Sequence, residues 1–413
     1  MSATDVVVTG LGATTPLGGD VASTWDGLIS GRSGVGKNEA EWVDTYELPA
    51  RLSATLAVEP SEVLPRVQLR RLDRCEQIGV IAAHQAWADA GFELPTDEQQ
   101  PVDPDRLGVS LGTGIGGPLT LLEQNDLLRD KGLRKVSPLT VPMLMPNGPA
   151  AHVSLALKAR AGVHSPASAC ASGSEGLATG LEMIRSGRAD VVVAGGAEAC
   201  IHPITVAGFA QSRTLSTRND APEEASRPFD TDRDGFVMGE GAGVVVLESA
   251  EHARARGARV YARLAGAGIT SDAYHITGND PECQVKAVRS AVQNAELTAD
   301  EVGHVNAHAT STVVGDVGES TAVRKALGDH VVLTAPKGSL GHLVGGAGAV
   351  ESIVTVLSLH NGVIPATRNL DNLDPKVELD VVAGEPRKVE LDAAVNDSFG
   401  FGGHNVALAF TRS

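Results

Sequence analysis

The chain has 413 residues, 42% of them hydrophobic and only 3% aromatic, which is enough for a large core built mainly from Val, Ala and Leu. The formal charge of −17 argues against a non-specific nucleic-acid binder, and no apolar run approaches the roughly 18 residues of a membrane span. The four scattered cysteines have no metal-ligand spacing and fit a reducing cytoplasm.

Short β-branched runs alternate with Ala- and Leu-rich helical stretches along the chain. This alternation predicts an α/β architecture with buried sheets. We expect strands at residues 5–10, 106–114, 189–196, 241–248, 303–309, 330–336 and 405–410, and helices at 76–91, 176–187, 284–297, 318–328 and 348–362. Residues 252–272 are interpreted as the join between two halves, 1–255 and 256–413. The halves should share a core, because no Pro- or Ser-rich linker separates them.

Two glycine-rich stretches invite a nucleotide interpretation. The segment GTGIGG, Gly112 to Gly117, matches G-x-G-x-x-G after a strand, and Thr9 to Gly19 comes close. Neither lies in a convincing βαβ unit with a well-placed acidic partner for a ribose. Tight turns are therefore the favoured interpretation over a dinucleotide site.

The stretch SPASACASGSEG, residues 165–176, places Cys170 just before a predicted helix whose apolar face is Leu177, Leu181 and Ile184. A thiol at the positive end of a helix should have a lowered pKa, and the small residues would let a bulky substrate reach the sulfur. The alternative is a buried cysteine in a tight turn. This stretch alone leaves both interpretations open.

Two histidines in the second half favour the reactive thiol. His308 and His342 each follow a strand-like run among small residues, and Lys337 precedes the second by five positions. A lone histidine is more often structural than catalytic, but this combination favours catalysis. The glycine loop at residues 396–405 carries two phenylalanines, and its backbone N–H groups could meet an oxyanion.

Five separated segments resemble the signature blocks of one enzyme family. They are SACASGSEG, RPFDTDRDGFVMGEGAG, VNAHATST, KGSLGHLVGGAGAVES and NDSFGFGGHN. In order and spacing they resemble the β-ketoacyl-[acyl-carrier-protein] synthases, in particular the elongating type II enzymes of the actinobacterial branch. The resemblance implies a thiolase-like layered αβαβα fold of two fused similar halves.

The resemblance also implies catalytic roles. Cys170 would accept the acyl group, and His308 and His342 would complete a Cys-His-His triad. Lys337 would support the site, chiefly through Glu319 and its surroundings.

Phe401 would be the gate beside the thiol, and the backbone N–H groups of Cys170 and Phe401 would form the oxyanion hole. Further substrate-binding positions would lie in the pantetheine channel (Thr310 and Thr312), at its mouth (Thr277), at the acyl pocket near a dimer interface (Ile115) and in the glycine loop (Gly402).

The implied reaction is the decarboxylative condensation of malonyl-carrier with a Cys-bound acyl chain in type II fatty acid biosynthesis. The implied partners are acyl carrier protein and a second copy of the chain. Carrier docking would use a local basic surface, although a solvated helix face is the simpler interpretation of the same residues: Arg66, Arg70, Arg71, Arg74 and Arg213. No cofactor is required. Some relatives hold a structural monovalent or divalent cation, whose ligands here would be Asn306, Glu351 and Asn396.

Three alternatives remain beside this interpretation. A polyketide ketosynthase would perform the same condensation on other chains. A non-catalytic partner subunit of this fold typically lacks the nucleophilic cysteine, which is present here. A degradative thiolase uses a second cysteine as its base, whereas this chain has the two-histidine pattern.

The motif His308-Ala309-Thr310 and the residue His404 depart from the commonest pattern of the family, and both are interpreted as branch variants.

Overall fold

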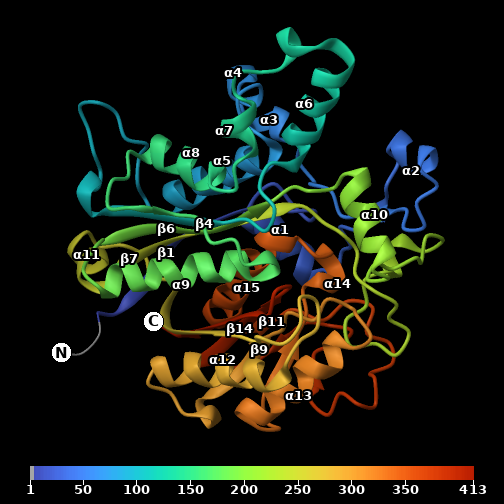
Figure 1. Ribbon diagram of the computed structural model, residues 1–413. Helices are drawn as coiled ribbons and strands as arrows, with labels where there is room; N and C mark the ends of the chain where they lie inside the picture. The colour runs from blue at the N-terminus through green and yellow to red at the C-terminus, as the bar shows by residue number, and fades with distance from the viewer. Residues whose placement is uncertain (1–3) are drawn as a thin grey trace.

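The computed structural model describes residues 4–413, so residues 1–3 of the expected first half lie outside the described residues. Two layers of strands alternate with three layers of helices (Figure 1). The upper helix layer is α5 (Arg74–Asp89) with α8 (Gly148–Leu157), the middle one α9 (Ser172–Arg185) with α15 (Ala347–Asn361), and the lower one α12 (Pro281–Asn294) with α13 (Gly315–Leu327). This is the layered thiolase-like fold that the sequence predicted.

The five main strands of each half follow one topology. Their spatial orders are β5–β4–β6–β7–β1 in the first half and β10–β9–β14–β15–β8 in the second. With each half counted in chain order, both read third, second, fourth, fifth, first. A short β1–β8 contact joins the two sets into one 11-stranded sheet, with β12 (Asp380–Val381) at its far edge. The first set is β1 (Val6–Thr14), β4 (Leu107–Gly112), β5 (Val163–His164), β6 (Val191–Glu198) and β7 (Gly241–Ser249), and the second is β8 (Ala262–Ser271), β9 (Val302–Asn306), β10 (Val332–Thr334), β14 (Ala393–Gly400) and β15 (His404–Thr411).

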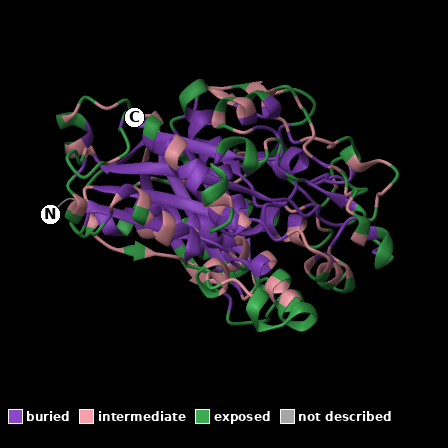
Figure 2. Cartoon of the chain, turned by 90° about the horizontal axis from the view of Figure 1, so that it is seen from above, coloured by how far each residue is buried: buried purple, intermediate pink, exposed green. Residues whose placement is uncertain are grey.

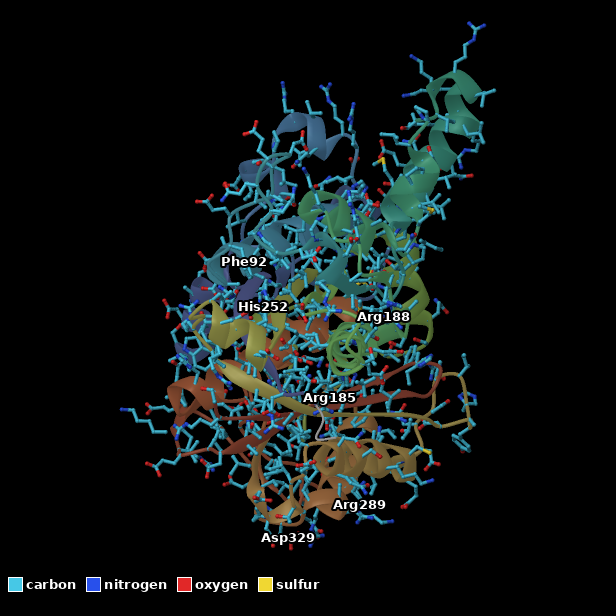
Figure 3. All side chains as sticks on the ribbon, turned by 90° about the vertical axis from the view of Figure 1, so that its left-hand side faces the viewer. Phe92, Arg185, Arg188, His252, Arg289 and Asp329 are labelled. Carbon is cyan, nitrogen blue, oxygen red and sulfur yellow. The ribbon has the colours of Figure 1, made fainter. Side chains whose placement is uncertain are left out.

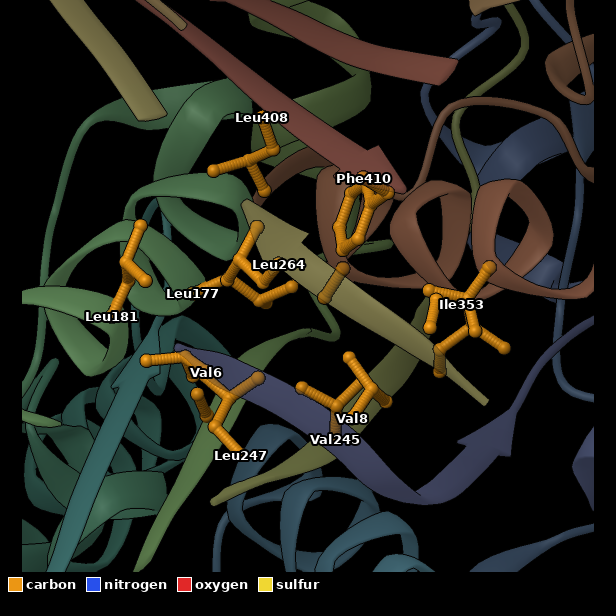
Figure 4. Packing of buried hydrophobic residues seen from close by; sticks show 14 of the residues in the cluster. Val6, Val8, Leu177, Leu181, Val245, Leu247, Leu264, Ile353, Leu408 and Phe410 are labelled. Carbon is orange, nitrogen blue, oxygen red and sulfur yellow. The ribbon is translucent and has the colours of Figure 1, made fainter. Parts of the chain in front are cut away.

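One hydrophobic core spans both halves, as expected from the missing linker. Val6 of β1 and Leu177 of α9 pack in the same cluster as Leu264 of β8, Ile353 of α15 and Phe410 of β15 (Figure 4). The strands are buried almost throughout, and exposed residues gather on the outer helices and loops (Figure 2). The apolar face predicted for α9 is buried along its length. The active-site loops are thus attached to a rigid interior.

Two segments differ from the sequence-based expectation. Residues 262–271, interpreted as part of the join, form the long strand β8, which pairs with β15 and β1. Residues 396–400, interpreted as the start of a glycine loop, complete β14, so the loop itself is confined to residues 401–403. Both segments are rich in Gly, Ala or polar residues, and only pairing with neighbours makes them strands. The boundary near residue 255 stays a prediction.

Shorter elements stand around the layered body. The segment with α6 (Pro118–Lys131) and α7 (Thr140–Leu144) projects away from it, as the view in Figure 3 shows. Near it lie α3 (Pro60–Val63) and α4 (Arg66–Leu69), while α10 (Pro203–Gln211) and α14 (Lys337–Leu340) flank the site described below. Within residues 4–413, no helix is long and apolar enough to cross a membrane.

Candidate active site

Cys170 lies in a 3₁₀ turn, Ala169–Ala171, that leads directly into α9. Ala169 has the left-handed φ of 52°, a strained conformation that often marks a functional turn. The end of β14 presses against this turn, because a Cβ at Gly400 would lie 2.4 Å from the Ser168 carbonyl oxygen. Glycine at position 400 therefore lets the backbone of residue 401 reach the sulfur.

The thiol faces His342, whose Nε2 lies 3.0 Å from Sγ. Burial raises the pKa of the Cys170 thiol to about 12, although the Lys337 charge and the Phe401 N–H oppose that rise. The expected lowering of this pKa by the helix is therefore wrong. Desolvation favours the neutral thiol and is the largest cause of the rise.

The small residues after Cys170 do not open a path for substrate. Ser172, Gly173 and Gly176 are buried, and a Cβ at Gly173 would lie 2.8 Å from the Ala349 backbone nitrogen. A Cβ at Gly176 would lie 2.3 Å from a backbone oxygen of β6. Their small size lets α9 pack closely against α15 and the sheet, which corrects the sequence-based interpretation.

Lys337 orients the ring of His308. Its buried Nζ lies 3.4 Å from His308 Nδ1 and forms an ion pair with Glu351. An ammonium group can only donate, so Nδ1 of His308 accepts and the ring proton sits on Nε2. The predicted contact between Lys337 and Glu319 is not observed, because the ammonium of Lys337 pairs with Glu351 instead.

Both imidazoles are neutral. Burial holds the pKa of His308 and of His342 well below its usual range, and the Lys337 charge adds to the effect. The two rings stand 5.4 Å apart, nearly perpendicular. They therefore form a pair of neutral hydrogen-bonding groups beside the sulfur.

Two buried carboxyl groups hold the backbone of the histidine loop. Glu319 accepts the N–H of Ala309 at 2.7 Å, and Asp397 accepts the N–H of His308 at 2.8 Å. Glu319 was named from the sequence, but Asp397 was missed. The signal was an acidic residue inside a strand that is otherwise uncharged.

A cavity of about 440 Å³ leads to Cys170, His308 and His342. Four phenylalanines line it together with four of the predicted substrate positions and one predicted docking arginine: Phe209, Phe236, Phe399, Phe401, Thr277, Thr310, Thr312, Glu319 and Arg213.

Two predicted positions lie outside this lining. Ile115 is 39% exposed and Gly402 follows the gate with a φ of 90°.

The predicted docking arginines fall into separate groups. Arg66, Arg70 and Arg71 are exposed on and after α4. Arg74 is instead the first residue of α5 and forms ion pairs with Glu59 and Glu240. Its charge is therefore neutralised within the chain, which removes it from the docking surface.

The three residues expected to bind a cation fit an oxygen-ligand site. Asn306 and Asn396 are paired across β9 and β14, and Asn306 Nδ2 donates to the Glu351 carbonyl at 2.9 Å. Within the described chain, Asn306 Oδ1, Asn396 Oδ1 and Glu351 Oε2 are buried without a hydrogen-bond donor. Hard cations prefer such oxygens.

Cys170, His308 and His342 could in principle hold a metal, since one ligand atom from each lies within 4.8 Å of the others. A zinc-binding histidine, however, normally donates its other ring N–H to an acceptor. Lys337 is a donor to Nδ1 of His308, so Nε2 carries a proton and cannot ligate. The arrangement is that of a nucleophilic acyl-transfer site, and the fold and site together define a condensing enzyme of the thiolase-like class.

Comparisons with known proteins agree with that class. Residues 3–253 match the β-ketoacyl synthase N-terminal domain and residues 261–371 its C-terminal domain. A 3-oxoacyl-[acyl-carrier-protein] synthase 2 of Mycobacterium tuberculosis is 47% identical over 98% of this chain and 97% of its own length. A β-ketoacyl synthase structure from Burkholderia phymatum superposes with a TM-score of 0.92 at 36% identity, covering 99% of this chain and 100% of that one.

A type II polyketide ketosynthase, solved in complex with its acyl carrier protein, has a TM-score of 0.90 at 30% identity and full coverage of both chains. The chain belongs to the β-ketoacyl synthase family. It is an acyltransferase-class condensing enzyme.

Proposed function

We propose that the chain elongates acyl groups by condensing malonyl-carrier protein with an acyl chain held on Cys170, in type II fatty acid biosynthesis. The observation that carries this proposal is the arrangement around the sulfur. His342 Nε2 lies 3.0 Å from Sγ, and the Lys337 contact leaves His308 with a proton on its Nε2. One sulfur nucleophile and two neutral imidazoles are what acyl transfer followed by decarboxylation requires.

In the first half-reaction, the Cys170 sulfur attacks the carbonyl carbon of the acyl-carrier thioester. The oxyanion accepts hydrogen bonds from the N–H groups of Cys170 and Phe401, which remain the predicted oxyanion hole. The carbon–sulfur bond to the carrier breaks, and the proton of the Cys170 thiol passes to the carrier sulfur as it leaves, while His342 keeps the proton on its Nε2. The high thiol pKa makes this proton transfer part of the attack rather than a prior ionisation.

In the second half-reaction, malonyl-carrier enters the same cavity. Its carboxylate leaves as CO2, and the electron pair of the broken bond becomes an enolate whose oxygen accepts from Nε2–H of His308 and His342. The carbanion attacks the acyl-Cys170 carbonyl, the bond to sulfur breaks and Cys170 takes up one proton. The product is a β-ketoacyl-carrier with two more carbons.

Two substitutions of Cys170 test this sequence of steps. Cys170→Ala should lower elongation at least about 1,000-fold, because no acyl-enzyme can form. Cys170→Gln places an amide where the acyl-enzyme carbonyl would be, and should raise malonyl decarboxylation above that of Cys170→Ala. Product analysis by mass spectrometry measures both, and elongation by Cys170→Ala at the wild-type rate would refute the mechanism.

The length and kind of acyl chain distinguish fatty acid synthesis from a polyketide pathway. The similarity to a polyketide ketosynthase supports the second only at the level of the family. A steady-state series of acyl-carrier substrates, from short to long and including a β-polyketone, compares the two. Saturated chains should give the higher kcat/KM.

Acyl carrier protein should dock on the exposed arginines at α4 and at the cavity mouth. Arg70→Glu with Arg71→Glu should raise KM for acyl-carrier at low salt, because carrier binding loses two favourable charges. Arg289→Glu, on the lower face in Figure 3, is the matched control and should leave KM unchanged. An unchanged KM in the double variant would exclude docking on α4.

We also propose a structural cation at Asn306, Glu351 and Asn396, supported by their three buried oxygens. A monovalent or divalent ion there would join β9, β14 and α15. Asn396→Leu should abolish its effect on thermal unfolding in a titration with Na⁺, K⁺ or Mg²⁺. An equal response of wild type and variant would refute the site.

A homodimer is proposed from the edge of the first sheet. The short strand β5 ends the sheet, and Leu155 of α8 and Val163 of β5 are 74% and 42% exposed. Sedimentation velocity should show a dimer that Leu155→Glu dissociates. A cytoplasmic location is supported by Cys75, Cys170, Cys200 and Cys283, which are all free thiols.

A further inference from the structure

Glu198 is a buried carboxylate with no role in the steps above. It ends β6, is fully buried, and accepts backbone N–H groups from two separate loops. Its Oε2 accepts from Gly114 at 2.6 Å, from Ile115 at 3.2 Å and from Gly345 at 3.3 Å. The carboxylate therefore joins the loop after β4 to the turn that follows His342.

The glycines of both loops make this approach possible. A Cβ at Gly114 or at Gly345 would lie 2.7 Å from Glu198 Oε2. A Cβ at Gly345 would also lie 2.3 Å from the Gly114 nitrogen. The GTGIGG segment is thus built around an internal carboxylate, and that negative charge excludes the pyrophosphate of a dinucleotide.

Both loops lie against the turns that carry the reacting groups. Val344, with a left-handed φ of 47°, follows His342 by two residues and lines the active-site cavity. A Cβ at Gly114 would lie 3.3 Å both from the Ala169 carbonyl and from a methyl of Val344. The carboxylate therefore lies behind the nucleophile turn and the histidine turn at once.

No cation balances this charge. Among residues 4–413, Glu198 forms no ion pair and is held only by backbone N–H groups. Burial raises the pKa of Glu198 to about 7, and those N–H groups oppose the rise. The charge of Glu198 raises the pKa of three thiols: Cys75, Cys170 and Cys200.

We propose that Glu198 is a positioning residue for the condensation: its carboxylate fixes the 113–116 loop and the 344–346 turn against each other and thereby sets the distance between Cys170 and His342. The inference rests on the proposed function. The carboxylate can hold the sulfur–imidazole geometry only while its Oε2 accepts from both loops. A displacement of about 1 Å in such a site costs up to roughly 100-fold in rate.

Glu198→Gln tests the proposal, because it removes the charge that strengthens these hydrogen bonds and leaves one acceptor oxygen in place of two. We expect kcat for condensation to fall roughly 10- to 100-fold, while KM for acyl-carrier and malonyl-carrier stays within about twofold, since Glu198 does not line the entrance. Glu198→Asp, which keeps two acceptor oxygens, should recover part of kcat. The pH midpoint of Cys170 alkylation by iodoacetamide should move down in Glu198→Gln, because a charge that raises the thiol pKa is removed.

Glu248→Gln is the matched control. Glu248 is a buried carboxylate on β7, at the opposite end of the β6–β7 pair. It pairs with Val191, which stands seven residues before Glu198 in β6, a distance of about 23 Å. In Figure 1, α11 (Ala250–Ala255), just after Glu248, lies on the left, and α10, soon after Glu198, lies on the right. The control should lower the thermal midpoint but leave kcat and the alkylation midpoint unchanged.

The outcomes separate the two proposals. If wild type condenses and a folded Glu198→Gln has the same kcat and alkylation midpoint, the positioning role is refuted and the function stands. If wild type does not condense, the function itself fails. If Glu198→Gln does not fold, Glu198→Asp decides: its carboxylate is one methylene shorter and should recover only part of kcat, so a wild-type kcat in that variant refutes the role.

Discussion

At the scale of single residues, the site contains one buried ammonium among several buried carboxyl groups. Lys337 is 1% exposed and pairs with Glu351, while Glu319 and Asp397 hold backbone N–H groups nearby. The sequence predicted the lysine but assigned it mainly to Glu319. Both glutamates lie on helices far apart in the chain, and only the tertiary packing decides which one reaches the ammonium.

Lys337→Met should abolish condensation and destabilise the chain. Removing the ammonium leaves His308 Nδ1 without its donor and Glu351 as an unpaired buried charge. We expect condensation to fall at least about 100-fold and the free energy of unfolding to fall by about 3–5 kcal/mol. Urea unfolding and a condensation assay measure the two effects.

The double variant Lys337→Met with Glu351→Gln separates those effects. It removes the unpaired charge, so part of the lost stability should return while condensation stays low. Full condensation activity in the double variant would show that Lys337 only stabilises the fold.

At the scale of elements, the nucleophile is placed by the close crossing of α9 and α15. The sequence predicted both helices and the apolar face of α9, because their periodicity is local. It did not predict that Gly173 lies against the backbone of Ala349. A contact between two backbones leaves no periodic signal, so small residues near a cysteine were interpreted as open space.

Gly173→Ala should destabilise the protein by about 1–3 kcal/mol, because its Cβ would meet the Ala349 nitrogen at 2.8 Å and the Gly345 oxygen at 2.9 Å. Gly208→Ala is the matched change. It is exposed within α10 and has nothing within 4 Å, so it should stabilise by up to about 1 kcal/mol. Differential scanning calorimetry compares them, and equal midpoints would contradict the packing argument.

At the scale of the whole molecule, the repeated topology explains why both halves contribute to one site. Strands β6 and β14 have the same place in their halves, and each ends beside the cavity, near Cys170. The α/β alternation predicted layered sheets, and the resemblance predicted their duplication. The strand β8 was missed, because its sequence is rich in Gly and Ala and its β-branched residues, Ile269 and Thr270, stand only near its end.

Buried acids make the stability of the whole fold depend on pH. Burial raises the pKa of Glu76 to about 8 and that of Asp316 to about 6. An acid with a raised folded pKa keeps its proton where the unfolded chain has released it. The unfolded state then binds fewer protons, so the free energy of unfolding falls as pH rises between the two pKa values.

Glu76→Gln tests this dependence at the N-terminal end of α5. The amide keeps the acceptor for the Asp73 N–H, which Glu76 binds at 2.8 Å, and cannot ionise. Between about pH 4.5 and 8, the wild type should lose up to about 1.4 kcal/mol per pH unit through this group, and the variant should lack that part of the slope.

Glu248→Gln is the control of opposite sign, because Arg256 and His252 hold the pKa of Glu248 down at about 2 against its burial. It should lower stability across pH 5–8 without changing the slope. Urea unfolding at pH 5, 6.5 and 8 measures all three proteins, and parallel curves for wild type and Glu76→Gln would show that Glu76 is ionised in the folded enzyme.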